Sequence, residues 1–293
     1  MTGKQGRDPL TEEKKEWLRF AGFAGGALAL SAALTGLSAL DRAGEIPYLW
    51  SLLTKVGILL LLALIISLSG TQAKLVEGRY LTRDVLWMAF PLLLTVAMSY
   101  GPFNTRPGIL VGGMLFLNTL ATVLWEELYF RFFSRLLFER KGVYHVRWVI
   151  LTAFMYGASR LPAVFVSPFG GILLKSVLAA SEGVFLLALY AKSRSIVLPM
   201  LSHFLTSFIY TFFHACSTGA EGVFGAGGVF LALLTVVYSA TGFWLLFSSR
   251  RIAERKKKAG QQVPASAPPC TGTTESRCPE PQDGAIPAAD RKP

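Results

Sequence analysis

The sequence is poor in charged residues and in cysteine. Only 16% of its 293 residues are Asp, Glu, Lys or Arg, whereas 52% are hydrophobic and the mean hydropathy is +0.47. Soluble domains carry about 25% charged residues, so this composition argues against a soluble protein and predicts a polytopic membrane protein. The three cysteines, Cys216, Cys270 and Cys278, form no C-x-x-C pair, which argues against a disulfide framework, a structural metal site and dithiol redox chemistry.

A cleavable signal peptide and a lipidation motif are also missing. The first sixteen residues are rich in charge, and the apolar run from Trp17 has no small-x-small exit. The last three residues, 291–293, contain no cysteine in a prenylation position. We therefore expect the first helix to remain as an anchor. Because no retrieval signal is visible, we expect a plasma membrane or a bacterial inner membrane.

Long apolar runs dominate what is present. Such runs of about 20 residues are typical of helices that cross a bilayer. They predict an all-α integral membrane protein with about eight transmembrane helices, at residues 17–40, 49–69, 85–101, 108–130, 146–166, 169–191, 196–213 and 223–248. After Lys258 the composition changes to Pro, Ala, Gly, Thr and Gln, which predicts a disordered tail over residues 259–293.

Basic residues are concentrated in alternate connections between these runs. They precede the first run and follow the second, fourth, sixth and eighth, the last being the basic segment 250–258. The positive-inside rule then places both termini in the cytoplasm, and segment 250–258 beside anionic lipid. The net charge of +11 therefore has a topological explanation and does not require nucleic acid as a partner.

Several charged residues interrupt the apolar runs. In the fourth run, Glu127 and Arg131 are four residues apart and can form an ion pair on one helix face, while Glu126 is rotated by about 100° and left free. Intramembrane acids are functional candidates because an unpaired carboxylate is costly in hydrocarbon. The alternative is a solvated helix end at the cytoplasmic interface. Lys175 and Glu182, seven residues apart in the sixth run, are expected to pair with neighbouring helices.

Two further pairs have the spacing of one helical turn. Tyr156 and Arg160 share a face of the fifth run, and His203 and Ser207 share a face of the seventh. Each pair also has a purely structural explanation. Arg160 can end its helix just before Pro162 and reach the far interface, and a lone helical histidine is often a satisfied core residue.

The three features in this order resemble the CAAX protease and bacteriocin-processing family, the glutamic-type intramembrane endopeptidases that include the type II CAAX prenyl proteases. The first motif of this family, E-E-x-x-x-R, is met by Glu126, Glu127 and Arg131. The resemblance covers about residues 105–215 and implies a helical membrane fold and peptide-bond hydrolysis.

The second and third family motifs are altered. The family has an aromatic residue followed four positions later by histidine, and then a histidine followed four positions later by asparagine. Tyr156 and His203 match, but Arg160 stands in place of the second-motif histidine and Ser207 in place of asparagine. Phe132 also replaces the glycine that commonly follows the first-motif arginine.

The resemblance implies a role for each matched residue. Glu126 corresponds to the glutamate that activates water, and His203 to an oxyanion donor. Arg160 cannot accept a proton or ligate a metal, and a cation beside Glu126 weakens that carboxylate as a proton acceptor. Ser207 retains one hydrogen-bond donor. No cofactor is expected, and Glu126, Glu127 and His203 alone make a poor zinc site.

These observations lead to three functional hypotheses for a cytoplasm-facing polar cavity between the fourth, fifth and seventh predicted helices. The first is an intramembrane endopeptidase acting on membrane-associated peptides or proteins. The second is a catalytically degenerate member of the family, a membrane scaffold or regulator in which Arg160 pairs with Glu126 or Glu127. The third is a transporter, although no inverted repeat is visible.

The predicted boundaries raise a question of depth. If the fourth helix ends at residue 130 and the fifth begins at 146, Glu126 lies about 7 Å from the cytoplasmic end and Arg160 about 20 Å. The predicted organisation of the chain has five segments. They are a cytoplasmic N-terminal segment (1–16), N-terminal transmembrane helices (17–104), a core that resembles the family (105–215), a final transmembrane helix (216–249) and a basic flank with a disordered cytoplasmic tail (250–293).

Overall fold

The computed structural model describes residues 9–43, 48–72, 75, 82–99, 108–140, 143–144, 146–165, 169–216 and 232–248. These residues belong to one compact unit, Met1–Arg251. The segment predicted to be a disordered tail, 259–293, and the basic segment 250–258 lie outside the described residues.

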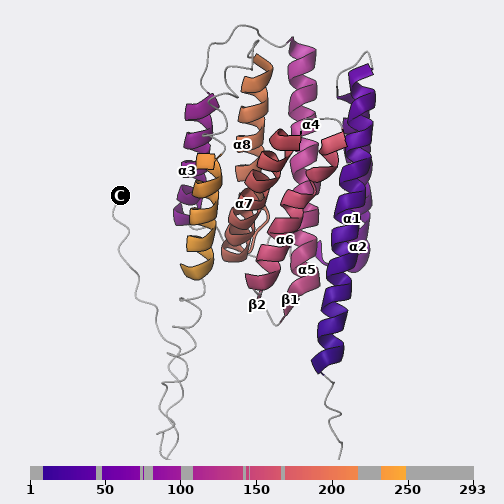
Figure 1. Ribbon diagram of the computed structural model, residues 1–293, viewed down its shortest axis with the longest axis vertical. Coiled ribbons are helices and arrows are strands. Elements are labelled where there is room, and N and C mark those ends of the chain that lie inside the picture. The colour runs from indigo at the N-terminus through magenta and orange to yellow at the C-terminus, as the bar shows by residue number, and fades with distance from the viewer. Residues whose placement is uncertain are drawn as a thin grey trace, which may run out of the picture. The chain divides into compact units, whose positions relative to one another are not determined.

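The described residues are almost entirely helical (Figure 1). The helices are α1 (Pro9–Ala43), α2 (Leu49–Ser69), α3 (Thr82–Ser99), α4 (Ile109–Glu127), a π-helix (Leu128–Phe133), α5 (Ser134–Phe138), α6 (Val146–Ala158), a 3₁₀ turn (Leu161–Phe165), α7 (Phe169–Ser193), α8 (Val197–Cys216) and the C-terminal helix (Ala232–Ser248). A hairpin of two-residue strands, β1 (Glu139–Arg140) and β2 (Val143–Tyr144), joins α5 to α6.

Five helical segments are long and apolar enough to cross a membrane, and three further apolar helices are shorter. The five are Glu13–Leu37, Leu49–Ser69, Ile109–Phe138, Val146–Phe165 and Phe169–Ser193, and the shorter ones are Val85–Ala97, Val197–Phe212 and Ala232–Ser248. Together they correspond to the eight predicted runs, so the prediction of an all-α polytopic membrane protein is confirmed. Of the last run, residues 232–248 are described as a helix, and residues 223–231 lie outside the described part.

The surface of α2 shows why these helices suit lipid. Its leucines Leu61, Leu64 and Leu68 are exposed, whereas the polar Ser51 and Lys55 are buried. A helix that turns leucine outward and polar groups inward is typical of a bilayer, where the surroundings are as apolar as the side chains.

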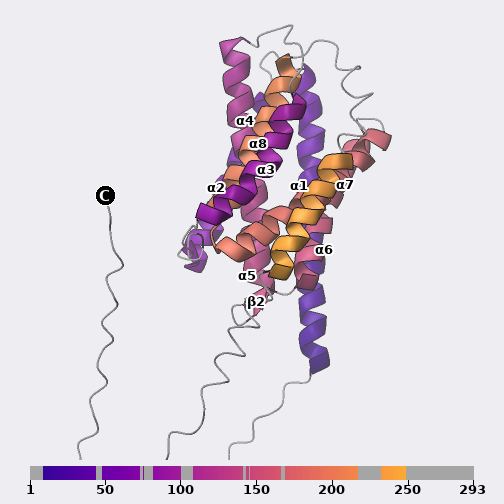
Figure 2. The same cartoon turned by 90° about the vertical axis from the view of Figure 1, so that its left-hand side faces the viewer.

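The helices pack around α4. This helix contacts α2 on one side and α8 on another, α6 runs along α7, and α3 packs on α8 (Figures 1 and 2). The α6 and α7 backbones approach closely at Gly157, where a Cβ atom would lie 2.5 Å from the carbonyl oxygen of Ser176. The C-terminal helix covers α7 through Leu234, Tyr238 and Leu245.

The fourth predicted helix does not end at residue 130. It continues from α4 through the π-helix into α5, so that the span reaches Phe138. Arg131 and Arg135, whose charges suggested a helix end, are buried at 0% and 8% exposure. Glu126 therefore lies about 18 Å from that end, and the predicted depth mismatch with Arg160 was wrong.

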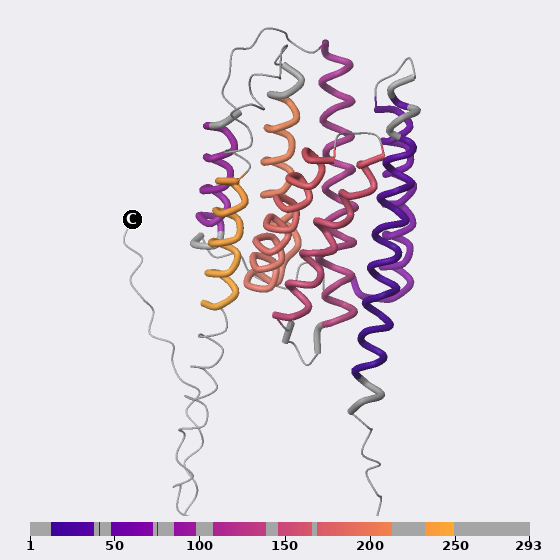
Figure 3. The backbone as a smooth tube through the Cα atoms, in the orientation of Figure 1, coloured from indigo at the N-terminus to yellow at the C-terminus, as the bar shows by residue number. Residues whose placement is uncertain are grey.

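The fifth predicted helix is shorter than expected. α6 ends at Ala158, and Arg160 lies in the turn that precedes the 3₁₀ segment. In Figures 1 and 3 the end of α6 and the start of α7 lie below the upper ends of α4 and α8. This turn brings the guanidinium of Arg160, whose side chain is 35% exposed, to 2.7 Å from the Glu126 carboxylate.

Candidate active site

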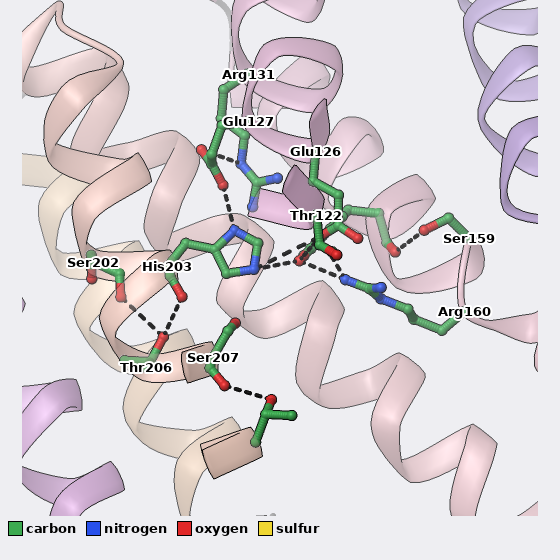
Figure 4. A network of polar contacts seen from close by, with 12 residues as sticks. Thr122, Glu126, Glu127, Arg131, Ser159, Arg160, Ser202, His203, Thr206 and Ser207 are labelled. Carbon is green, nitrogen blue, oxygen red and sulfur yellow. Dashed lines mark hydrogen bonds and ion pairs between the residues drawn. The ribbon is translucent and has the colours of Figure 1, made fainter. Parts of the chain in front are cut away.

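The Glu126 carboxylate at the end of α4 is the centre of a buried polar network (Figure 4). Its Oε2 atom accepts hydrogen bonds from the Tyr156 hydroxyl at 2.8 Å and from Nη2 of Arg160 at 2.7 Å. Nη2 of Arg160 also donates to the Tyr156 hydroxyl at 2.8 Å. The expectation that Glu126 is left free was therefore wrong, because the turn after α6 brings a cation to it.

The imidazole of His203, on α8, lies between the two glutamates (Figure 4). Its Nδ1 is 2.8 Å from Oε1 of Glu127, whereas its Nε2 is 3.2 Å from the Tyr156 hydroxyl and 3.7 Å from Oε2 of Glu126. Glu127 thus orients the ring, and Nε2 is the nitrogen that faces Glu126.

Glu127 and Arg131 form the predicted ion pair, with 3.4 Å between Oε2 and Nε. Both side chains are fully buried, and the guanidinium carbon of Arg131 lies 4.3 Å from the centre of the Tyr156 ring. The guanidinium carbon of Arg160 lies 4.9 Å from the same centre. Tyr156 therefore contacts both arginines and Glu126, and it is linked to Glu127 through His203 and Arg131. Phe132, in the place of the family's glycine, is buried against Ile66 and Tyr190.

Two cavities adjoin this network. One, of about 330 Å³, is lined by Glu126, Arg160 and polar side chains of α1, α2 and α4. The other, of about 340 Å³, is lined by Arg160, Ser207, Glu182 and residues of α3, α8 and the C-terminal helix. Arg160 and Lys175 line both cavities. We call them the Glu126 cavity and the Glu182 cavity.

Most of the predicted site residues meet in this network. Glu126, Glu127, Arg131, Tyr156, Arg160 and His203 are connected by the contacts described above. Ser207 does not join them and lines the Glu182 cavity instead. Lys175 and Glu182 both line the Glu182 cavity, and their expected pairing with neighbouring helices stays a prediction.

Sequence reasoning missed one further buried cation. Lys55 of α2 is 8% exposed, and its Nζ donates to Oδ1 of Asn118 on α4 at 2.7 Å. The Ser51 hydroxyl donates to the same oxygen at 3.3 Å. Lys55 and Ser51 both line the Glu126 cavity. A single lysine inside the otherwise apolar run 49–69 was the available signal, because an intramembrane charge marks a functional candidate.

The donor set of the site does not form a metal centre. Among the described residues, no group of three or more His, Cys, Asp or Glu side chains is arranged to hold a metal ion. The groups that the described site offers are carboxylates, an imidazole, a phenol and guanidinium groups.

The comparison with known families agrees with the motifs. Residues 109–209 match the family model described as type II CAAX prenyl endopeptidase Rce1-like. No curated protein and no solved structure matches the chain. The matched residues include both glutamates, Tyr156, Arg160 and His203, so the resemblance expected from the motifs is confirmed. In residues 109–209 the chain is therefore similar to the Rce1-like type II CAAX prenyl endopeptidases, and its long apolar helices are those of an integral membrane protein.

Proposed function

We propose that the protein is an intramembrane endopeptidase that hydrolyses membrane-associated peptides with a water molecule activated by Glu126. The observation that supports this most directly is that Glu126, beside His203, lines a cavity of about 330 Å³. A water molecule occupies about 30 Å³ in the liquid, so this cavity has room for water and for part of a peptide.

The proposed reaction begins with a water molecule hydrogen-bonded to the Glu126 carboxylate. The carboxylate takes one proton as the water oxygen attacks the scissile carbonyl carbon. Negative charge then develops on the carbonyl oxygen, where a protonated His203 donates a hydrogen bond from Nε2. The protonated Glu126 finally gives its proton to the leaving nitrogen, and the C–N bond breaks. Glu127 acts as a positioning residue, since it holds Nδ1 of the same ring.

Arg160 limits this reaction in the observed arrangement. Its guanidinium occupies Oε2 of Glu126 and favours the ionised carboxylate, which makes Glu126 a weaker proton acceptor. Arg160 also adds a positive charge close to the place where the oxyanion forms, which stabilises the transition state. Arg160 thus weakens Glu126 as a base but helps to stabilise the oxyanion. Because the first effect opposes the activation of water, we expect a slow enzyme.

The experiment is proteolysis by the purified protein in lipid vesicles, with a panel of membrane-anchored fluorogenic peptides. Three variants are compared with the parent: Glu126→Gln, Arg160→His, and Glu13→Gln as a matched control at an exposed site. We expect Glu126→Gln to lower the rate by about 10² to 10⁴ and Arg160→His to raise it. Cleavage by Glu126→Gln at the parent's rate would refute the assignment of the base.

A second candidate function, a membrane scaffold or regulator, is favoured by one observation. The direct 2.7 Å ion pair between Arg160 and Glu126 locks the end of α4 to the turn after α6. On this hypothesis neither the parent nor Arg160→His cleaves any peptide of the panel, whereas Arg160→His lowers the stability of the folded protein.

We also propose a plasma or bacterial inner membrane with both termini in the cytoplasm. The support is the distribution of basic residues on the described helices. Lys14, Lys15, Arg147 and Lys192 all lie at helix ends on one face of the molecule, which the positive-inside rule assigns to the cytoplasm. Lipid surrounds the apolar outer surfaces, and the substrates of the proposed reaction are membrane-associated peptides or proteins.

A further inference from the structure

The helices alternate in direction, so their ends define two faces of the molecule. One face, here called the basic face, contains the start of α1, the end of α5, the start of α6 and the end of α7. The opposite face contains the end of α1, the starts of α2 and α4, the end of α8 and the start of the C-terminal helix. The start of α7 points toward this face but lies below it (Figure 3). The position of a residue along its helix therefore shows which face it lies nearer.

The Glu126 cavity lies on the side of the opposite face. Its lining from α1 is Ser31, Leu34 and Thr35, in the second half of that helix. From α2 it includes Ser51 and Lys55, in the first two turns. α7 contributes only its first turns. Each of these segments is the part of its helix that lies farther from the basic face.

The Glu182 cavity lies on the same side. Ser207 and Tyr210 come from the second half of α8, and Thr95 comes from the last turns of α3. Leu234 and Tyr238 come from the first half of the C-terminal helix. In Figure 3 the connection between α6 and α7 lies below the upper ends of the neighbouring helices. Both cavities border this connection through Arg160, so they lie at the level where it falls short of the opposite face.

Large side chains fill the space between the glutamates and the basic face. Phe130, Phe138 and Trp148 are at most 1% exposed, and the rings of Phe138 and Trp148 stack with their centres 4.5 Å apart. Ser134 on α5 is also fully buried, and its hydroxyl donates a hydrogen bond to the carbonyl oxygen of Phe130. We call Phe130, Ser134, Phe138 and Trp148 the aromatic seal.

We propose that the site is reached from the face opposite the basic face, and that its substrates are peptide segments exposed at that membrane surface. By the positive-inside rule this surface is the non-cytoplasmic one. The expected cytoplasm-facing cavity is then replaced by a cavity that opens away from the cytoplasm. The substrate class rests on the proposed proteolysis, whereas the access route rests only on the cavities, the seal and the helix directions.

Access is tested by the reaction of single cysteines with a small, membrane-impermeant methanethiosulfonate, in the full chain with Cys216, Cys270 and Cys278 replaced by serine. Ser31→Cys reports on the Glu126 cavity and Ser207→Cys on the Glu182 cavity. Ser134→Cys is the matched control in the aromatic seal. Lys14→Cys and Ile109→Cys report on the two faces, since Lys14 is exposed near the start of α1 and Ile109 is 98% exposed at the start of α4.

We expect Ser31→Cys and Ser207→Cys to react at least tenfold faster when the reagent is on the side that labels Ile109→Cys than on the side that labels Lys14→Cys. Ser134→Cys should react only after denaturation, which shows that the variants are folded. Faster reaction from the Lys14 side would overturn the proposal. Protection of both cavity cysteines from either side, until denaturation, would also overturn it.

A second arm separates access from catalysis. Peptides of one sequence are anchored so that the scissile segment lies at one surface or the other, and their cleavage is compared in sealed vesicles. Cleavage restricted to the Ile109 side supports the substrate class, and cleavage restricted to the Lys14 side refutes it. If neither orientation is cleaved while the cysteines react as expected, the proposed proteolysis fails and the access route stands.

Discussion

Neutralising Glu127 is expected to destabilise the protein strongly. In Glu127→Gln the shape of the side chain is kept, and the amide oxygen can still accept a hydrogen bond from Nδ1 of His203. Only the negative charge is lost, and Arg131 keeps a fully buried guanidinium. No nitrogen of that guanidinium has a hydrogen-bond acceptor within the described structure, so its closest remaining partner is the face of the Tyr156 ring.

Two estimates of the effect agree. The Coulomb energy of two unit charges 3.4 Å apart is about 5 kcal/mol at an effective dielectric constant of about 20. Removal of one partner from a buried ion pair typically costs about 3 to 5 kcal/mol. We therefore expect Glu127→Gln to lower the free energy of unfolding by about 3 to 5 kcal/mol.

The loss should be largely reversed in the double variant Glu127→Gln/Arg131→Met, because the uncompensated charge is replaced by an apolar side chain of similar length. The free energy of unfolding is measured by graded denaturation in mixed micelles, with Glu13→Gln as the matched control. Glu13 is exposed on α1, so its neutralisation should not change stability measurably.

Two results would contradict this reasoning. The first is a loss of less than about 1 kcal/mol in Glu127→Gln, the range expected for a surface ion pair. The second is a double variant that is no more stable than Glu127→Gln, since the destabilisation would then have a cause other than the buried charge of Arg131.

Three further substitutions test the packing, each by the free energy of unfolding. Gly26→Ala places a Cβ atom 2.6 Å from the Tyr129 hydroxyl and should cost about 1 to 2 kcal/mol, whereas Gly25→Ala, with open space around it, should be neutral or stabilising. Gly157→Ala forces α6 away from α7 and should cost about 1 to 3 kcal/mol or more. Asn118→Leu removes the only acceptor described for the buried ammonium group on α2 and should cost about 1 to 3 kcal/mol. An unchanged stability in Gly26→Ala or Gly157→Ala would show that the neighbouring groups move aside freely, and in Asn118→Leu it would show that the Lys55 ammonium group finds another partner.

The fold was predictable where apolar length alone sets the boundary. The run 49–69 became α2 residue for residue, because it is continuous and is followed by Gly70, which ends the helix at a φ of 64°. The end of the fourth run was not predictable in this way. Arg131 and Arg135 looked like interface residues, yet both are buried over the rings of Tyr156 and Tyr190. Their environment comes from other helices.

In the site, too, contacts within one helix were predictable and contacts between helices were not. Spacing within one helix correctly suggested the pair of Glu127 and Arg131, because four residues make about one turn. Contacts between helices could not be derived from spacing, since they depend on how the helices pack. The orientation of His203 by Glu127 and the bond from Lys55 to Asn118 are of this kind.

The π-helix at residues 128–133 makes the site dependent on chain length as well as on residue type. A π-helix is in effect an α-helix with one residue inserted, so the acids before it and the aromatic residues after it differ in phase from a regular helix. Deletion of any one residue in this segment would rotate one side by about 100° relative to the other. Either Glu126 and Glu127 would leave the network, or Phe138 would leave its stack on Trp148. The length of the segment is thus held constant from both ends, in addition to the contacts that Phe130 and Arg131 make within it.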